Sequence, residues 1–258
     1  MKLYDYPKGQ NERYDSSYKP TTQTKLFQMS IKDIYSVESI PKHETHDWLL
    51  KKHYAKRIPI ILKCFGLYHI EKGLMGVCTF GPPPIEWNDP KVLFNNNVNE
   101  KINMFELNRL VVNENLEKNV LSFFVSSSLN FLKKPCVVLS YSDMTKNHHG
   151  YIYQATNWFY TGSIAKREVF INNHTGKEEH PRSIYGIFGT SSKEDSQIKK
   201  HYTIKKQEPK HRYFYFLGNK KIKKAMRKNI KYDVLPYPKG NNQRYDASYK
   251  PQTQTKLF

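Results

Sequence analysis

The chain has 258 residues, 38% of them hydrophobic, and Lys and Arg outnumber Asp and Glu by 42 to 23, which gives a net charge of +19. This excess predicts a polyanionic partner, nucleic acid before an anionic membrane surface. No apolar run reaches about 18 residues and neither a signal peptide nor a CxxC pattern is present, so we expect a soluble, cytoplasmic domain with free cysteine thiols.

A polar peptide stands at both ends of the chain. Residues 6–27 read YPKGQNERYDSSYKPTTQTKLF and residues 237–258 read YPKGNNQRYDASYKPQTQTKLF, with 18 of 22 positions identical. Both copies contain two prolines and lack the period of a helix or a strand, so neither is expected in a core. The sequence predicts a flexible tail over 1–27, a folded domain over 28–232 and a second tail over 233–258.

The segments between the tails alternate between helical and strand-like patterns. In the first half of the chain we expect a helix over 28–57, a β-hairpin of 60–70 and 74–80, a surface loop over 85–103 and a strand over 104–112. A helix over 119–134, capped by Asn119 and ended by Pro135, is followed by a strand over 136–142 and a helix over 151–160. The last elements are a second hairpin of 167–171 and 184–188, a strand over 212–217 and a basic helix over 220–230. This order predicts a mixed α/β sheet with helices on both faces.

Two charged residues occur in or beside predicted apolar strands. Arg109 lies in FELNRLVV, where it is exposed, paired with Glu106, or placed in a cleft that holds an anion or a carboxylate. Asp143 follows CVVLSYS, at the kind of strand end where α/β proteins bind ligands, although it also suits a turn or a helix N-cap. The neighbouring His148 and His149 are weak ligand candidates by themselves.

A basic segment precedes the second tail. Residues 199–231 contain 13 Lys and Arg residues and a single acid, Glu208, interspersed with aromatic side chains. Lysines neutralise phosphates and aromatic rings stack on bases, so we expect DNA contacts here rather than a merely solvated face. The expected DNA-binding residues are Lys205, Lys206, Lys210, Arg212, Lys220, Lys221, Lys223, Lys224, Arg227 and Lys228.

Several stretches follow one another in a recognisable order. They are HYAKR before the first hairpin, FELNRLVV, the Ser-containing helix, SYSD, GYIYQATNWFYTG, KHRYFYFLG and the closing YPKG…RYDASYKP. Together they resemble the phage Mom family of DNA adenine modification proteins, over roughly residues 45–258. The resemblance implies a GNAT-like acyltransferase fold and conversion of adenine in double-stranded DNA to an N6-methylcarbamoyl form, which protects phage DNA from host restriction. The functional positions it implies are His53, Tyr54, Arg109, Ser122, Asp143 and Tyr153.

The implied reaction gives several of these side chains a role. Adenine N6 is a poor nucleophile because its lone pair is delocalised into the ring, and the base must leave the stack to react. Tyr54, Tyr153 and Trp158 would hold the flipped base. Asp143 would accept the N6 proton, and Arg109 would fix or polarise the donor's carbonyl.

Two cofactors are connected with the resemblance. Iron has been linked to the family, and His53, Asp143 and His149 would suit it, with His53 otherwise an acid or base. A GNAT-like fold implies a donor of the acetyl-CoA type, usually held by a glycine-rich turn that enters a helix. The corresponding connector, residues 113–119, has two acids and no glycine, which argues against ordinary acetyl-CoA.

The QTKLF sequence that closes both tails resembles the bacterial sliding-clamp binding pentapeptide, Gln-x-x-Leu-Phe. In such a peptide Leu and Phe fill an apolar pocket while Gln forms hydrogen bonds beside it. The clamp-binding residues would be Gln23, Leu26, Phe27, Gln254, Leu257 and Phe258. The alternative is a duplication without that role.

Two other functions remain open from the sequence. One is a non-catalytic DNA-binding or replication accessory protein on a GNAT-like scaffold, and the other is an acetyltransferase that acts on a small molecule or a protein. The enzyme hypothesis requires that Arg109, Asp143 and His53 converge on one cleft.

Overall fold

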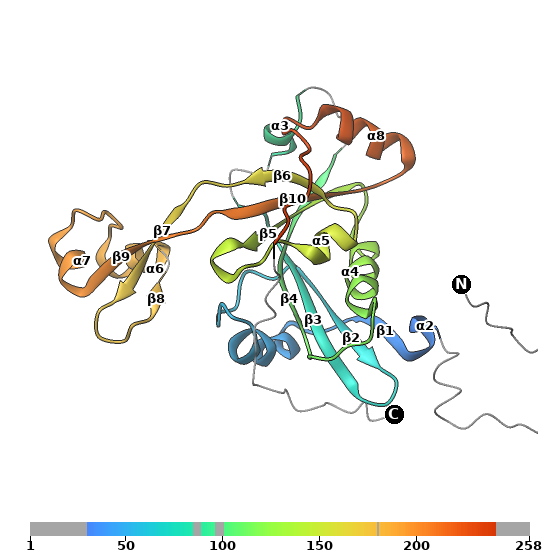
Figure 1. Cartoon of the computed structure of the whole chain (residues 1–258), viewed down its shortest axis with the longest axis horizontal. Coiled ribbons are helices and arrows are strands. Elements are labelled where there is room, and N and C mark those ends of the chain that lie inside the picture. The colour runs from blue at the N-terminus through green and yellow to red at the C-terminus, as the bar shows by residue number, and fades with distance from the viewer. Residues whose placement is uncertain (1–29, 85–88, 96–100, 180, 241–258) are drawn as a thin grey trace, which may run out of the picture.

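The computed structural model describes residues 30–84, 89–95, 101–179 and 181–240, and its centre is a seven-stranded sheet (Figure 1). In spatial order the strands are β1 (Tyr35–Ser39), β2 (Lys63–His69), β3 (Gly73–Gly81), β4 (Asn103–Val112), β5 (Cys136–Asp143), β10 (Lys210–Leu217) and β6 (Phe159–Ser163). All neighbouring strands are antiparallel except β4 and β5, which are parallel. The predicted mixed α/β sheet is confirmed.

Helices cover both faces of this sheet, as predicted. On one face α4 (Val120–Asn130) and α5 (Tyr151–Ala155) share a core cluster with Cys78 of β3 and Val138 of β5. On the other face α3 (Pro90–Leu93) and α8 (Lys220–Asn229) pack against Val137 of β5, and the π-helix η2 (Trp48–Lys52) packs against Val77 of β3. Among the described residues, no helix is both long and apolar enough to cross a membrane.

The parallel strands β4 and β5 pair over only four residues each. Asn103–Glu106 lie opposite Cys136–Leu139, and no pairing continues beyond that point although both strands do. β4 continues along β3 with an irregularity at Asn108, where Thr79 pairs with Arg109 but Phe80 pairs with Leu107. An extra residue of this kind bends a strand and redirects its side chains, a feature common beside active sites.

An insertion between β6 and β10 forms an arm that projects from the main sheet (Figure 1). The arm has a three-stranded sheet in the order β8-β7-β9, built from β7 (Arg167–Asn172), β8 (Glu178–Glu179) and β9 (Tyr202–Gln207), with α6 (Pro181–Phe188) and α7 (Ser196–His201). Its own small core contains Phe170, Ile184, Ile198 and Tyr202. The arm therefore has packing independent of the main sheet.

Three predicted elements are wrong. The segment 28–57 is not one helix, because Tyr35 and Val37 form β1 between α2 (Ile31–Ile34) and the short helix η1 (Lys42–Thr45). The helix predicted over 151–160 ends at Ala155, since Asn157 takes a left-handed conformation and the chain continues as β6. Residues 184–188 belong to α6, so the second hairpin has other partners.

The remaining predicted elements are present, with ends shifted by a few residues. They are the first hairpin as β2 and β3, the strands as β4, β5 and β10, and the helices as α4 and α8. The loop expected over 85–103 contains α3, and parts of it lie outside the described residues. The first tail and residues 241–258 of the second also lie outside them, so the predicted domain limits stay a prediction.

Candidate active site

A cavity of about 550 Å³ opens where β4 and β5 diverge. Its wall combines the second half of β4, residues 113–119, the first turn of α4, the end of β5 and α5, with residues 52–54 at one side. A volume of this size suits a small organic ligand or a base. All six residues implied by the family resemblance line it: His53, Tyr54, Arg109, Ser122, Asp143 and Tyr153. The required convergence is therefore present, while a catalytic role for each residue stays a prediction.

Arg109 is a half-buried residue of the cavity wall. It follows the irregularity of β4 at Asn108, and its Nη1 donates a hydrogen bond of 2.6 Å to the Asn108 carbonyl. This bond fixes one end of the guanidinium. The cleft placement expected from the sequence is observed, and it puts a positive charge where an anion or a polarised carbonyl would gain most.

Asp143 ends β5 and is only 6% exposed. Its Oδ1 accepts a hydrogen bond of 3.0 Å from the Thr145 N–H, which caps the short helix η4 (Met144–Lys146). Its Oδ2 lies 3.6 Å from Nζ of Lys210 on the neighbouring β10. Both sequence interpretations thus hold together, because the same carboxylate caps a turn and faces the cavity.

His53 is a buried imidazole stacked on Tyr54, with ring centroids 4.4 Å apart. Burial first, then the charges of Arg109 and His148, lower the pKa of His53 to about 3, so the ring is neutral at physiological pH. Its Nδ1 accepts a hydrogen bond of 3.0 Å from the Ala55 N–H, which leaves the proton on Nε2. His53 therefore presents a hydrogen-bond donor rather than a base.

The low pKa of His53 makes the free energy of unfolding depend on pH. Below about pH 6.5 the imidazole of the unfolded chain is protonated, whereas that of the folded chain stays neutral down to about pH 3. The free energy of unfolding therefore decreases as the pH falls through this window. We expect His53 to contribute a loss of about 2 kcal/mol between pH 7 and pH 5, in addition to the loss from partly buried imidazoles such as His148, measured by urea unfolding. His53→Gln should remove much of this dependence. The exposed His43→Gln should retain it, and equal curves for both variants would contradict the assignment.

Tyr153 forms a buried part of the wall on α5. Ser140 Oγ lies 2.8 Å from the Leu107 carbonyl and 2.7 Å from the Tyr153 hydroxyl. Because Ser140 has one proton and the carbonyl can only accept, the Tyr153 hydroxyl donates to Ser140. The ring packs between Trp158 and Tyr213, with centroids 5.0 Å from each. Tyr153 is thus held rigidly at the cavity.

Tyr153→Phe is expected to cost about 1 kcal/mol of stability, the usual net value of one buried hydrogen bond. Urea unfolding at pH 7 measures it, and Tyr185→Phe, on an exposed ring of the arm, is the matched control. A loss of adenine modification far beyond that expected from the stability change would assign Tyr153 a role in the reaction. A stability change no larger than that of the control would contradict the hydrogen bond.

Ser122 lies in the first turn of α4, and its Oγ donates a hydrogen bond of 2.9 Å to the Asn119 carbonyl. Trp158 does not line the cavity. It is fully buried beneath Tyr153 and Tyr215, so its predicted contact with a flipped base is wrong.

The iron ligands expected at His53, Asp143 and His149 are not brought together. The His149 ring points to His211, with Nδ1 3.4 Å from its Nε2, and does not line the cavity. Nδ1 of His53 already accepts from Ala55. No cluster of three His, Cys, Asp or Glu side chains suited to a metal occurs among the described residues. This ligand set does not fit the ion.

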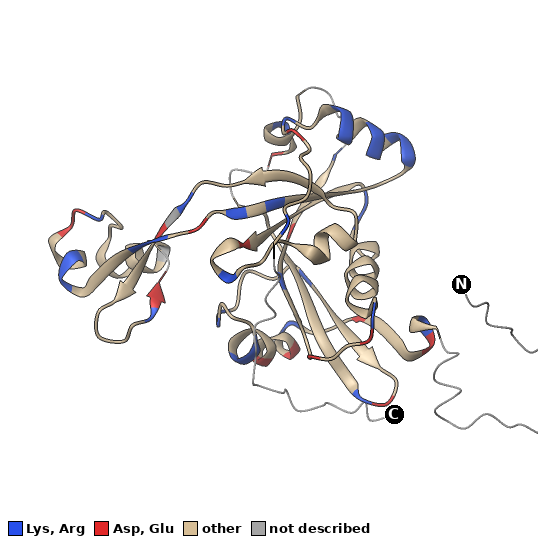
Figure 2. Cartoon of the chain, viewed as in Figure 1, with Lys and Arg blue, Asp and Glu red and all other residues tan. Residues whose placement is uncertain are grey.

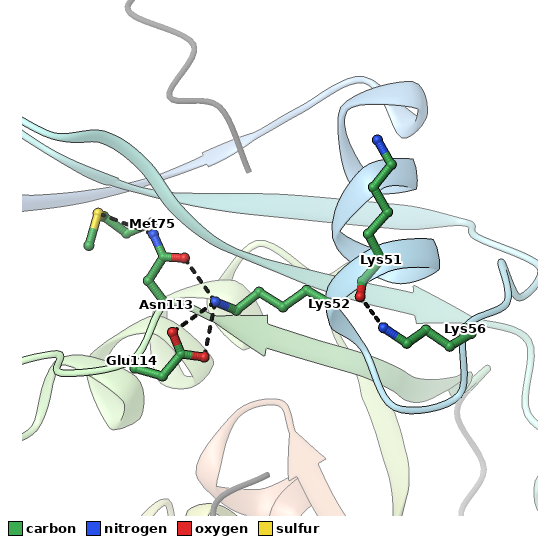
Figure 3. Close-up of polar contacts among 6 residues, drawn as sticks. All are labelled: Lys51, Lys52, Lys56, Met75, Asn113 and Glu114. Carbon is green, nitrogen blue, oxygen red and sulfur yellow. Dashed lines mark hydrogen bonds and ion pairs between the residues drawn. The ribbon is translucent and has the colours of Figure 1, made fainter. Parts of the chain in front are cut away.

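The sequence interpretation treated one residue of the cavity wall, His148, as only a weak ligand candidate and missed another, Lys52. His148 lines the cavity with its ring 6.0 Å from that of Tyr54, and burial lowers its pKa while the nearby Asp143 charge opposes the shift. Lys52 is 2% exposed, and its Nζ lies 3.1 Å from both Asn113 Oδ1 and Glu114 Oε2 (Figure 3). Lys52 therefore anchors η2 to the connector that follows β4.

The connector of residues 113–119 does not form a glycine-type cradle for a pyrophosphate. Its two left-handed positions are occupied by Asn115 and Asn119, and the Asn119 side chain makes no cap hydrogen bond. Glu114 pairs with Lys52, and Glu117 accepts a hydrogen bond from the Tyr35 hydroxyl. Two carboxylates beside the helix start repel a pyrophosphate, so these residues do not fit the usual coenzyme A site.

The expected DNA-binding residues divide into three places. Lys205 and Lys206 are exposed on β9 of the arm, and Lys210 lies at the cavity end of β10 beside Asp143. Figure 2 shows the remaining cations gathered along α8, where Lys220, Lys221, Lys223, Lys224, Arg227 and Lys228 are all exposed.

Arg212 is buried, unlike the other expected DNA-binding residues, and the prediction that it contacts DNA is wrong. It is 8% exposed, its Nε donates to Thr161 Oγ1 at 2.9 Å, and its guanidinium lies 3.9 Å from the centre of the Tyr232 ring. These contacts join β10, β6 and the C-terminal segment. Arg212 is therefore structural and not a DNA contact.

Comparison with solved structures finds similarities of low sequence identity. Among solved structures, the chain is similar to spermidine/spermine N-acetyltransferase SpeG from Vibrio cholerae in complex with manganese ions, with a TM-score of 0.37 and 8% identity over 72% of this chain and 95% of that one. It is also similar to the C-terminal condensation domain of Ebony in complex with beta-alanyl-dopamine, with a TM-score of 0.38 and 9% identity over 71% and 99%.

No curated protein matches the sequence. The family model that matches is that of the Mom protein family, and it covers residues 34–239, from the start of the main sheet to the beginning of the second tail. This match includes every described element that lines the cavity, and the chain belongs to the Mom protein family.

Proposed function

We propose that the chain is a phage-type DNA-modifying transferase that converts adenine in double-stranded DNA to an N6-methylcarbamoyl form. The observation that supports this most is the convergence of the six family positions on one cavity, from segments up to about a hundred residues apart in the chain. Residues with purely structural roles are not expected to gather at one solvent-accessible cavity.

The proposed reaction forms a bond from adenine N6 to the carbonyl carbon of an activated methylcarbamoyl donor and breaks the bond from that carbon to the leaving group. Asp143 accepts the N6 proton as the new bond forms. Arg109 stabilises the negative charge that develops on the carbonyl oxygen. The neutral His53 donates a hydrogen bond from Nε2, and Tyr54 offers an aromatic face to the extruded base.

Double-stranded DNA would reach from the cavity to α8. The two lie at opposite ends of β5 and β10, since Asp143 pairs with Lys210 at one end and Cys136 with Leu217 at the other. Seven steps along a strand span roughly 23 Å. At about 3.4 Å per base pair this distance corresponds to about seven base pairs. The lysines of α8 would therefore hold the duplex well away from the base that reacts.

The direct test is mass spectrometry of nucleosides from the DNA of cells that produce the chain. The proposal predicts a deoxyadenosine in which a methylcarbamoyl group replaces one N6 hydrogen, absent from cells without the chain. DNA binding by the purified chain together with unmodified adenine would instead favour a non-catalytic accessory protein. An altered small molecule or protein, with unaltered DNA, would favour an acetyltransferase of another kind.

We also propose that the tails bind the bacterial sliding clamp. Support comes from sequence alone, because Gln23, Leu26, Phe27, Gln254, Leu257 and Phe258 lie outside the described residues. Such a contact would raise the concentration of the enzyme near newly replicated phage DNA in the host cytoplasm. Loss of clamp binding on deletion of both Leu-Phe pairs, and its retention with either pair present, is the expected result.

A further inference from the structure

The first four residues of the second tail copy pack on the folded domain. The Tyr237 hydroxyl donates a hydrogen bond of 2.7 Å to the Trp158 carbonyl, and Nε2 of Gln154 donates one of 3.2 Å to the Pro238 carbonyl. The Tyr151 hydroxyl donates to the Gly240 carbonyl. Just before them, the Leu235 N–H bonds the Tyr160 carbonyl at 2.9 Å. We call the surface formed by residues 149, 151, 154, 158 and 160 the tail seat.

The tail seat is selective for the sequence that occupies it. The hydrogen bond to Trp158 requires a hydroxyl at the position of Tyr237. A Cβ on Gly240 would collide with the His149 ring, so any other residue there requires that ring to move. Proline presets the backbone between these two positions and presents a carbonyl to Gln154. The hydrogen bond from Leu235 to Tyr160 comes from the backbone N–H, which any residue except proline supplies.

The first tail copy repeats this sequence without change. Residues 6–9 read YPKG, as residues 237–240 do, and residue 4, at the position of Leu235, is a tyrosine, which also has a backbone N–H. Every feature by which the tail seat selects its occupant is therefore present twice in one chain, whereas the folded domain offers one seat.

We propose that the tail seat is a binding site for the YPKG tetrapeptide and that residues 6–9 of the same chain compete with residues 237–240 for it. One copy is then held on α5 while the other extends from the domain with its QTKLF end. Because Tyr151 also lines the cavity, the exchange takes place at the rim of the candidate active site.

The first tail copy can reach the seat of its own chain. Twenty residues separate Gly9 from Ser30, and twenty extended residues span at most roughly 65 Å. The described chain begins next to α2, whose Ile31 and Ile34 pack on the same core cluster as Tyr153 of α5. A tether of this length gives an effective concentration on the order of millimolar, so competition within the chain outweighs exchange between chains at micromolar protein.

The test compares full-length chains in which one tail copy or both are disabled. Tyr6→Ala with Gly9→Val disables the first copy, and Tyr237→Ala with Gly240→Val disables the second. The probe is a fluorescein-labelled peptide with the sequence of residues 3–12, and fluorescence anisotropy measures its binding. We expect the chain with both copies disabled to bind the peptide. Each chain with one intact copy should bind it at least about tenfold more weakly, because the tethered copy occupies the seat.

Two controls define the site. Gln154→Ala in the chain with both copies disabled should weaken binding, and a peptide with the Tyr→Ala and Gly→Val changes should not bind. The proposal is overturned if the peptide fails to bind the chain with both copies disabled, or binds equally well when residues 6–9 are intact. It is also overturned if protection by residues 6–9 disappears on dilution, which would mean exchange between chains. Tyr237 is 40% exposed and outside every core cluster, so these changes leave the fold intact.

Discussion

Asp143→Asn is expected to reduce N6-modified adenosine at least about 100-fold in cells that produce the chain, measured by nucleoside mass spectrometry. General acid–base groups typically contribute 10²–10⁴-fold to a rate, and the amide cannot accept the N6 proton. The substitution keeps the shape of the side chain and leaves an oxygen that can accept the hydrogen bond from Thr145. Asn is about as good as Asp at a helix N-cap, so the fold should be retained.

This choice of variant separates the two roles of the carboxylate. If Asp143 serves only as a cap, Asn replaces it and modification persists. If it accepts the proton, modification is lost while stability is nearly unchanged. Asp195→Asn is the matched control, since Asp195 caps α7 in the arm through hydrogen bonds to Gln197 and Ile198 and lies outside the cavity. It should leave modification at the level of the unaltered chain.

The sequence predicts the centre of the fold better than its edges. β3, β4, β5 and β10 are dense in apolar residues and read as strands by themselves. β1 was missed because it is only five residues long and three of them are polar, so that pairing with β2 decides its structure. α6 was missed because isoleucine and phenylalanine favour strands locally, whereas burial of Ile184 in the arm core favours a helix.

The cavity itself could not be predicted from local patterns. Its residues come together because β4 and β5 separate after a short parallel pairing, which no single stretch of sequence reveals. The choice between His148 and His149 depends on one turn of backbone, in which Asn147 and Gly150 take left-handed conformations. Gly150 is required there because a Cβ would enter the Tyr213 ring. Lys52 was missed because its partner Asn113 lies 61 residues away in the chain.

Removal of positive charge from α8 is expected to weaken DNA binding strongly and to lower its salt dependence. The variant Lys220→Gln, Lys221→Gln, Lys224→Gln and Lys228→Gln changes four exposed lysines on a helix that has no acid, and keeps Arg227, whose guanidinium lies 5.2 Å from the centre of the Phe159 ring. Each phosphate contact contributes about 0.9 to the slope of log K against log salt concentration. If all four lysines contact phosphates, affinity at 0.1 M salt should fall about 4,000-fold, and about eightfold if only one does.

The matched control changes four exposed lysines elsewhere to Gln and lowers the net charge equally. They are Lys32, Lys42, Lys63 and Lys72. A general effect of charge would reduce affinity to the same degree in both variants, whereas a DNA path along α8 reduces it mainly in the first. The slope of log K against log salt concentration decides between them, since only contacts made to phosphates release counterions. An unchanged slope in the α8 variant would place the duplex elsewhere, with the exposed Lys205 and Lys206 of the arm as the next candidates.

Because α8 and Asp143 lie at opposite ends of β5, the α8 variant should also leave the cavity intact. Its loss of modification should therefore be restored by higher DNA concentration or lower salt. Asp143→Asn should not be rescued in this way, and that contrast separates binding of the duplex from chemistry at the base.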